Sequence, residues 1–145
     1  MAYKTTIESI MSKEVFTVGF EDTIRRVDEI MKSENVHHVP VVEDKKLVGM
    51  ITERAILEYS LRKLYEYDDT YGDAGQNRIC DYQEVMARNL QVIYPEDSVF
   101  KAVEIIVKKK IDCLPVVDWN YNLVGIITLF DILLFFHKKL KEDYK

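Results

Sequence analysis

The spacing of apolar residues changes several times along the chain, and the same order of changes occurs twice. Segments 15–18 and 90–94 are short and rich in β-branched and aromatic residues, which predicts strands. Apolar residues then recur at helical spacing over 21–36 and again over 96–111. This spacing predicts two amphipathic helices, one in each half of the chain.

Each predicted helix is preceded by residues that favour a helix start. Asp22 or Thr23 can cap the first helix, and Asp97 or Ser98 can cap the second, because their side-chain oxygens can accept a hydrogen bond from a free backbone N–H. The sequence leaves open which residue of each pair is the cap.

Two hairpins follow the predicted helices, each built from an apolar strand, a polar turn and a second apolar strand. The predicted strands are 38–43 with 47–52 in the first half and 114–118 with 123–128 in the second half. A further helix is expected directly after each threonine that closes a hairpin, over 53–64 and 129–140. Each half is therefore predicted to be β-α-β-β-α, a small sheet with two helices on one face.

The two halves align residue by residue, which makes them copies of one unit. The matched pairs are Met11 with Met86, Pro40 with Pro115, Gly49 with Gly125, and Thr52 with Thr128. A unit present only twice fits a pseudo-symmetric pair better than a solenoid, which needs three or more repeats. We assign 1–64 to the first repeat, 65–78 to a linker loop and 79–145 to the second repeat, with short helices expected at 6–11 and around 79–86.

Several separate motifs carry a family resemblance. The segments "IMSKEVFTV" and "HHVPVVEDKKLVGMIT" in the first repeat, and "VMARNLQVIYPEDSV" with "CLPVVDWNYNLVGIITLFD" in the second, resemble the cystathionine β-synthase (CBS) domain. The arrangement resembles the tandem pair called a Bateman module, and the match covers nearly the whole chain apart from the linker and the two ends. The resemblance implies an α+β fold (α/β by some schemes) in which the two repeats pack through their sheets around a pseudo-two-fold axis.

The resemblance also implies a function. Members of this family are mostly regulatory modules rather than catalysts, and two clefts between their repeats often hold adenine nucleotides or S-adenosylmethionine. We therefore expect a ligand-sensing module that is not an enzyme, needs no cofactor, and binds AMP, ADP, ATP or a ligand similar to S-adenosylmethionine. The alternative is a protein-interaction or regulatory scaffold module in which the same clefts are vestigial.

Composition narrows the class of protein. A hydrophobic content of 48% is enough for a buried core, and a formal net charge of -5 argues against nucleic-acid binding through a basic surface. No apolar stretch approaches the roughly 20 residues that cross a bilayer, and the N-terminus has no apolar signal core, so we expect a cytoplasmic protein. Cys80 and Cys113 match no metal-ligand spacing, which favours reduced thiols and no metal site.

The stretch "GIITLFD" can supply polar groups for a nucleoside phosphate. Thr128 opens a helix whose free N–H groups suit an anion, and Asp131 lies on the same first turn. By the resemblance, the Asp131 carboxylate accepts hydrogen bonds from ribose hydroxyls. A threonine followed three residues later by an acid is also a capping arrangement that needs no ligand.

The first repeat has alanine at the matching position. Its stretch "GMITERA" keeps Thr52 and Arg54 for a phosphate, but Ala55 offers no acceptor for a ribose. We therefore expect a first-repeat site that is weaker, empty or altered in specificity, formed by Thr52 and Arg54 together with Ser12 and Val36.

The residues before each Pro-Val-Val run also favour the Asp131 cleft as the stronger site. The first repeat has His37 and His38 there, and the second has Asp112 and Cys113. The resemblance implies that side chains at this position reach phosphates held by the opposite repeat, so the histidines would serve the Asp131 cleft. Asp112 would repel phosphates in the other cleft. Alternatively, the histidines are partly exposed residues at a strand start.

The resemblance implies that the base of the ligand lies among backbone and apolar groups of the second repeat. These are Arg88, Asn89 and the following Leu90, with Ile111 and Ile126. Arg88 could instead contact phosphate or remain solvated.

The C-terminal stretch "FDILLFFHKKLKEDYK" is amphipathic and bulky, which is typical of a core or dimer helix. By the resemblance we expect a homodimer, with an unidentified effector protein as the recipient of its signal.

Overall fold

The computed structural model describes residues 4–65 and 85–145, without the side chains of residues 64 and 65. The described residues form two compact units. One, the α3 unit, contains residues 16–65 and 85–90, and the other, the α5 unit, contains residues 4–15 and 91–145. The chain therefore leaves the α5 unit after Val15 and returns to it at Gln91.

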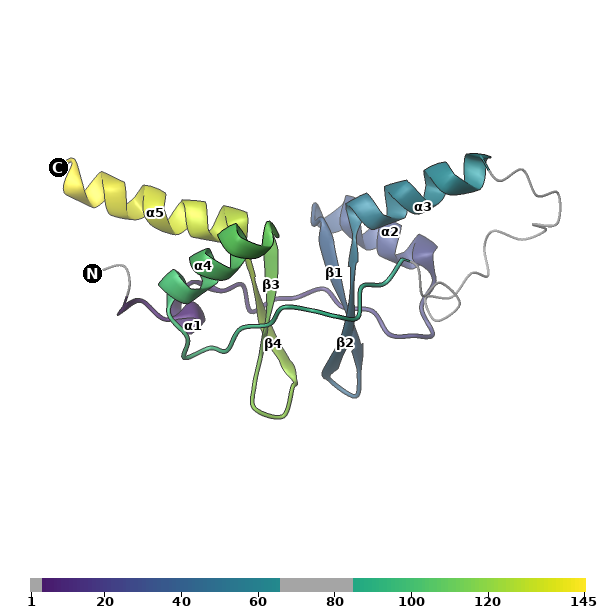
Figure 1. Cartoon of the computed structure of the whole chain (residues 1–145), viewed down its shortest axis with the longest axis horizontal. Helices are drawn as coiled ribbons and strands as arrows, with labels where there is room; N and C mark the ends of the chain where they lie inside the picture. The colour runs from purple at the N-terminus through teal and green to yellow at the C-terminus, as the bar shows by residue number, and fades with distance from the viewer. Residues whose placement is uncertain (1–3, 66–84) are drawn as a thin grey trace. The chain divides into compact units, whose positions relative to one another are not determined.

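The α3 unit is built on an antiparallel hairpin. Its elements are α2 (Ile24–Glu34), β1 (His38–Glu43), β2 (Lys46–Thr52) and α3 (Glu53–Tyr65). Pro40 pairs with Met50 and Val41 with Gly49 across the hairpin. Helix α2 packs on β1 and helix α3 packs on β2, and both helices lie on the same side of the hairpin (Figure 1). The buried side chains between these layers form an apolar core that includes Val27, Val39 and Ile51.

The α5 unit repeats this plan with different side chains. Its elements are α1 (Ile7–Ile10), α4 (Val99–Lys109), β3 (Cys113–Val117), β4 (Leu123–Thr128) and α5 (Leu129–Asp143). Pro115 pairs with Ile126 and Val116 with Gly125, which is the register of the other hairpin. A second apolar core, which includes Ile7, Leu114 and Ile127, lies between this hairpin and its helices.

The strands predicted at 15–18 and 90–94 were wrong in extent. Each segment makes one parallel bridge to the first strand of a hairpin, Val18 to Val41 and Ile93 to Val116, instead of a continuous ladder. The Val18 amide donates to Pro40 O at 3.1 Å, and the Val42 amide donates to Val18 O at 2.9 Å. A single buried valine or isoleucine at each of these places anchors a segment that is otherwise irregular.

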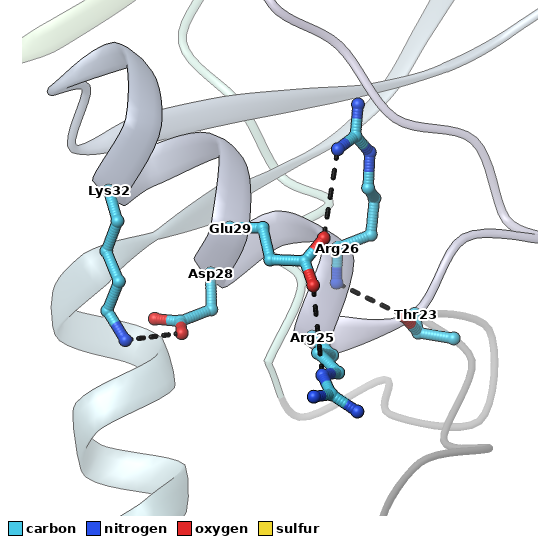
Figure 2. A network of polar contacts seen from close by, with 6 residues as sticks. All are labelled: Thr23, Arg25, Arg26, Asp28, Glu29 and Lys32. Atoms are coloured by element: carbon cyan, nitrogen blue, oxygen red, sulfur yellow. Dashed lines mark hydrogen bonds and ion pairs between the residues drawn. The ribbon is translucent and has the colours of Figure 1, made fainter.

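The helix starts settle which capping residue is used. The N-caps of α2 and α4 are Thr23 and Ser98, whose side chains accept hydrogen bonds from the amides of Arg26 and Lys101 at 3.1 Å each. Figure 2 shows the Thr23 cap together with ion pairs between charged residues spaced three or four apart along α2. The aspartates before the caps accept from earlier amides, Asp22 from Gly19 and Asp97 from Tyr94.

Each unit is completed by a short segment from the other repeat. In the α5 unit, Ser12 forms an antiparallel bridge with Ile126 on β4. In the α3 unit, Ala87 forms the equivalent bridge with Met50 on β2. The short helix predicted at 6–11 is confirmed as α1, and it packs in the α5 unit. The helix predicted around 79–86 and the linker 65–78 lie largely outside the described residues.

Methionine side chains explain why glycine stands opposite each bridging segment. A Cβ atom at Gly125 would lie 2.6 Å from Met11 Sδ, and a Cβ atom at Gly49 would lie 2.3 Å from Met86 Sδ. Each methionine therefore covers a glycine of the hairpin, and any larger residue there would have to displace it.

Candidate site at the start of helix α5

Thr128 and Asp131 form a reciprocal capping box at the start of α5. The Asp131 amide donates to Thr128 Oγ1 at 3.2 Å. In return, the Thr128 amide and the Thr128 hydroxyl both donate to Asp131 Oδ2, at 2.8 and 2.9 Å. The capping interpretation of the pair is confirmed, and it leaves the carboxylate in a fixed orientation.

The two oxygens of the Asp131 carboxylate are occupied differently. Oδ2 accepts two hydrogen bonds from Thr128. In the described part of the chain, Oδ1 has one donor, the Ser12 hydroxyl, at a distance of 3.5 Å. Because a carboxylate oxygen accepts up to about two hydrogen bonds and 3.5 Å is a long contact, Oδ1 retains capacity for a further donor.

Ser12 was assigned to the first-repeat site, but it lies in the α5 unit beside Asp131. Its hydroxyl contacts Asp131, and its backbone pairs with Ile126: the Ser12 amide donates to Ile126 O at 2.9 Å, and the Ile126 amide donates back at 3.0 Å. The reason is that residues 4–15 of the first repeat pack in the α5 unit, while residues 85–90 of the second repeat pack in the α3 unit.

Arg88 and Asn89 of the second repeat lie in the α3 unit. We grouped them with Asp131, but both belong to the α3 unit, where the neighbouring Ala87 exchanges backbone hydrogen bonds with Met50 at 2.9 and 3.0 Å. Both side chains are exposed. The residue of the α5 unit that matches Arg88 is Lys13, directly after Ser12, which we missed although the alignment of "MSK" with "MAR" indicated it.

Further groups of the α5 unit surround this helix start. The Leu129 amide donates to Asp112 O at 2.8 Å, so one of the first amides of α5 is already bonded. The Asp112 side chain is exposed. Ile111 packs half-buried against the apolar core, and Ile126 is 9% exposed. Ile111, Asp112, Ile126, Thr128 and Asp131 therefore belong to one unit.

Cys113 lies beside this group in a buried position. It pairs with Thr128 across the hairpin. Burial raises the pKa of its thiol above its ordinary value, and the nearby charges of Asp112 and Asp131 raise it further. Cys113 is therefore a neutral, unreactive thiol at neutral pH.

The start of α3 has a different set of polar contacts. The Thr52 hydroxyl accepts from the Ala55 amide at 3.0 Å, so Thr52 caps its helix as Thr128 does. No carboxylate follows three residues later, because that position is Ala55. Two nitrogen-bearing side chains nearby contact glutamates of the same unit: Arg54 Nε lies 3.1 Å from Glu58 Oε1, and His37 Nδ1 contacts the Glu53 carboxylate.

A pocket of about 200 Å³ opens on the α3 unit between α2 and the start of α3. Asp28 holds Lys32 at 2.7 Å on its rim, and this hydrogen bond and charge raise the pKa of Lys32. The lining residues are Asp28, Met31, Lys32, Asn35, Val36, His37, Glu53 and Ile56. Val36 and His37 thus line this pocket, whereas Ser12 does not.

Neither a metal centre nor a membrane span emerges from the described residues. Within 4–65 and 85–145, no three His, Cys, Asp or Glu side chains gather closely enough to hold a metal ion. No helix of that part of the chain is both long and apolar enough to cross a bilayer.

The repeated hairpin with two helices on one side defines a class of small paired α+β modules, and comparison with known proteins identifies the family. The CBS domain family matches residues 7–62 and 83–138. The chain belongs to the CBS domain family and contains two copies of the domain.

Among curated relatives, the CBS domain-containing protein YhcV of Bacillus subtilis is 35% identical over 128 residues, covering 88% of this chain and 83% of that protein. A homoserine O-acetyltransferase of Methanosarcina acetivorans is 29% identical over 133 residues, which is 91% of this chain and 22% of that protein. The chain thus spans about a fifth of that enzyme and most of YhcV.

Solved structures share the fold. The CBS domain pair of protein MJ0100, in complex with 5′-methylthioadenosine and S-adenosyl-L-methionine, has a TM-score of 0.76 and 27% identity and covers 91% of this chain and 99% of that chain. A putative acetoin utilization protein (AcuB) from Vibrio cholerae has a TM-score of 0.77 and 26% identity, with 96% and 95% of the two chains covered. The α+β fold with two repeats is thereby confirmed.

Proposed function

We propose that this chain is a regulatory module that binds an adenosine ligand at the start of α5, with Asp131 as the acceptor for the ribose hydroxyls. The observation that carries the proposal is the unequal use of the Asp131 carboxylate. Thr128 fixes Oδ2 with two hydrogen bonds, while Oδ1 has one long contact to Ser12. A fixed carboxylate with a free acceptor position suits a diol, because hydrogen bonds to a charged group contribute roughly 1.5 to 3 kcal/mol each.

The MJ0100 pair supports the choice of ligand class. It is 27% identical to this chain and was solved with 5′-methylthioadenosine and S-adenosyl-L-methionine. Both ligands contain a ribose and an adenine. These two shared groups are what the proposal takes from the MJ0100 complex. AMP, ADP and ATP share the same two groups and remain candidates.

The remaining parts of the ligand are assigned by chemistry. Ile111 and Ile126 supply apolar surface for the base on the α5 unit. Asp112 adds a negative charge at the same helix start, which disfavours extra phosphates unless a cation offsets it. His37 and His38 remain our proposed phosphate contacts, and His37 would have to exchange its contact with Glu53 for a phosphate.

The start of α3 is the weaker position in this proposal. Ala55 supplies no carboxylate, and Arg54 and His37 are each paired with a glutamate of the same unit. An anionic ligand there would compete with Glu58 and Glu53 for these side chains. We therefore propose that Thr52, Arg54 and Val36 serve a weaker or more selective site.

A thermal-shift panel tests the proposal. The ligands are AMP, ADP, ATP, S-adenosylmethionine and 5′-methylthioadenosine, with guanosine monophosphate as the base control. A ligand that binds only the folded state raises its apparent stability by mass action. The proposal requires a shift with at least one adenosine ligand that disappears in Asp131→Ala, and it fails if none of these ligands produces a shift.

A second candidate function, a protein-interaction module, is favoured by the apolar surface of α5. Phe130, Leu133 and Leu140 are 71%, 60% and 55% exposed. Exposed apolar side chains in such number on one helix are typical of an interface. We propose that this helix mediates a homodimer. Size-exclusion chromatography with light scattering tests this, and a monomer at all concentrations would contradict it.

A further inference from the structure

Residues 5–12 form an arm that is docked on the α5 unit at two places. At its start, the Ile7 amide donates to Asp97 O and the Val99 amide donates to Thr5 O, each at 2.8 Å. At its end, Ser12 and Ile126 exchange two backbone hydrogen bonds of 2.9 and 3.0 Å. Between them, the Met11 side chain covers Gly125. The arm is thus held by its backbone, by Ile7, which is buried in the apolar core of the unit, and by Met11 over Gly125.

The docked end of the arm reaches the proposed ligand site. Ser12 bonds with its backbone to Ile126, which we assign to the base, and with its hydroxyl to Asp131, which we assign to the ribose. If the arm leaves β4, Oδ1 loses its contact with the Ser12 hydroxyl, and Ile126 loses its backbone hydrogen bonds to Ser12. The ligand-binding surface is therefore complete when the arm is docked.

We propose that docking of the arm 5–12 and binding of an adenosine ligand at Asp131 are thermodynamically linked, so that the ligand favours the docked arm and the docked arm favours the ligand. This inference rests on the proposed function. Linkage is reciprocal: whatever factor the docked arm adds to ligand affinity, the ligand adds to docking. Ser12 acts here as a positioning residue for Asp131.

The linkage gives the module a route for its signal. The arm continues without interruption to Phe16, the first residue of the α3 unit. A ligand that changes how firmly the arm is docked on the α5 unit therefore changes how firmly residues 13–15, which lead into the α3 unit, are held. The regulatory output in this scheme is the mobility of the 5–15 segment.

The α3 unit contains a natural control. Ala87 makes the same backbone pair with Met50, and Met86 covers Gly49 as Met11 covers Gly125. Position 87 has no hydroxyl, however, and position 55 has no carboxylate. The same type of docked segment is thus present without the polar connection, and the linkage is specific to the arm at Ser12.

Hydrogen–deuterium exchange on the whole chain tests the inference, with and without 5′-methylthioadenosine, whose ribose hydroxyls are intact and which has no phosphate. We expect the ligand to slow exchange of amides in 7–12 at least about fivefold, the lower end of usual coupling factors. Met11→Ala should loosen the arm and weaken 5′-methylthioadenosine binding about fivefold or more. The matched control Met86→Ala should change that affinity less than about twofold.

Ser12 variants separate positioning from folding. Ser12→Ala should lower the affinity while leaving the unliganded thermal midpoint within error, and Ser12→Thr should restore the affinity because it keeps the hydroxyl. Faster arm exchange in Met11→Ala with unchanged affinity would overturn the linkage. Gly125→Ala gives a second test of the linkage, because its added Cβ displaces the Met11 side chain from the hairpin without altering Met11 itself.

The outcomes distinguish the two proposals. If 5′-methylthioadenosine binds the wild type through Asp131 but arm exchange is unchanged, the linkage is wrong and the proposed function stands. If none of the panel of adenosine ligands binds the wild type, both are overturned. Slower arm exchange on ligand addition, lost in Asp131→Ala, supports both.

Discussion

The Ser12 hydroxyl donates to Oδ1 of Asp131 at 3.5 Å although the two residues are 119 positions apart in the sequence. This contact exists because residues 4–15 pack in the α5 unit: Ser12 belongs to the first repeat, and Asp131 lies in the first turn of the last helix of the second. It places a donor on the one oxygen of Asp131 that Thr128 does not use. The α5 site therefore draws on both ends of the chain.

Thr128→Ala should destabilise the protein more than Thr52→Ala. Both threonines cap a helix, but Thr128 also donates its hydroxyl to Asp131 and takes part in a full capping box. We expect a loss of about 1 to 2 kcal/mol in the free energy of unfolding for Thr128→Ala and about 1 kcal/mol or less for Thr52→Ala. Urea denaturation measures both, and a larger loss for Thr52→Ala would argue against the box.

Gly125→Ala should be far more damaging than Gly19→Ala. A Cβ atom at Gly125 would lie 2.6 Å from Met11 Sδ and 3.1 Å from Ser12 O, whereas the nearest atom to a Cβ at Gly19 is 3.6 Å away. We expect about 1 to 3 kcal/mol of destabilisation at Gly125, the usual cost of overpacking, and a change within about 0.5 kcal/mol at Gly19. Equal thermal midpoints for the two variants would contradict the packing of Met11.

Stability should decline at alkaline pH through Cys113. Its pKa in the folded protein is raised above the ordinary value of 9.0 by burial and by the carboxylates of Asp112 and Asp131. Below pH 9 the thiol is neutral in both the folded and the unfolded state, so its contribution to the free energy of unfolding is fully present. Above pH 9 the unfolded chain ionises the thiol and the folded chain does not, so the contribution is lost at up to about 1.4 kcal/mol per pH unit.

Urea denaturation at pH 8 and pH 10 measures this decline. Wild type and Cys113→Ala share every other titrating group, so the difference between their pH dependences isolates Cys113. The variant should lose less stability between the two pH values than the wild type. Identical losses would place the thiol in a more solvated position than the structure gives it.

Leu133→Glu should convert a dimer to a monomer. The side chain is 60% exposed on α5, and a buried glutamate without a partner would be costly in a dimer interface. Val107→Glu on α4 is the matched control, since Val107 is also exposed, at 70%, but lies on another helix. Light scattering should find dimer for wild type and Val107→Glu and monomer for Leu133→Glu. Dimers of all three would exclude the α5 interface.

Most of the fold could be predicted from the sequence because its elements have clear local signals. Helical spacing gave α2 and α4, and the apolar runs around Gly49 and Gly125 gave the two hairpins. The segments 15–18 and 90–94 were predicted as strands on their β-branched and aromatic residues. The structure has one bridge at each, because a single buried residue in each segment meets the hairpin.

The site residues within one continuous stretch were also predictable. Thr128 and Asp131 are three positions apart on one helix turn, so their contact follows from helix geometry. Ser12 and Arg88 each lie in the other unit from the helix start with which we grouped them, because we assumed that a segment packs with the repeat that follows it. That choice is made by long-range packing of Met11 on Gly125 and Met86 on Gly49, which no local pattern encodes.

Calorimetric titration of 5′-methylthioadenosine into wild type, Asp131→Ala and Ala55→Asp tests the central claim most directly. The account predicts one main binding event in the wild type, its loss in Asp131→Ala, and its retention in Ala55→Asp, where the new carboxylate lies at the start of α3. Asp131→Ala that binds as tightly as the wild type would contradict the claim that Asp131 accepts the ribose.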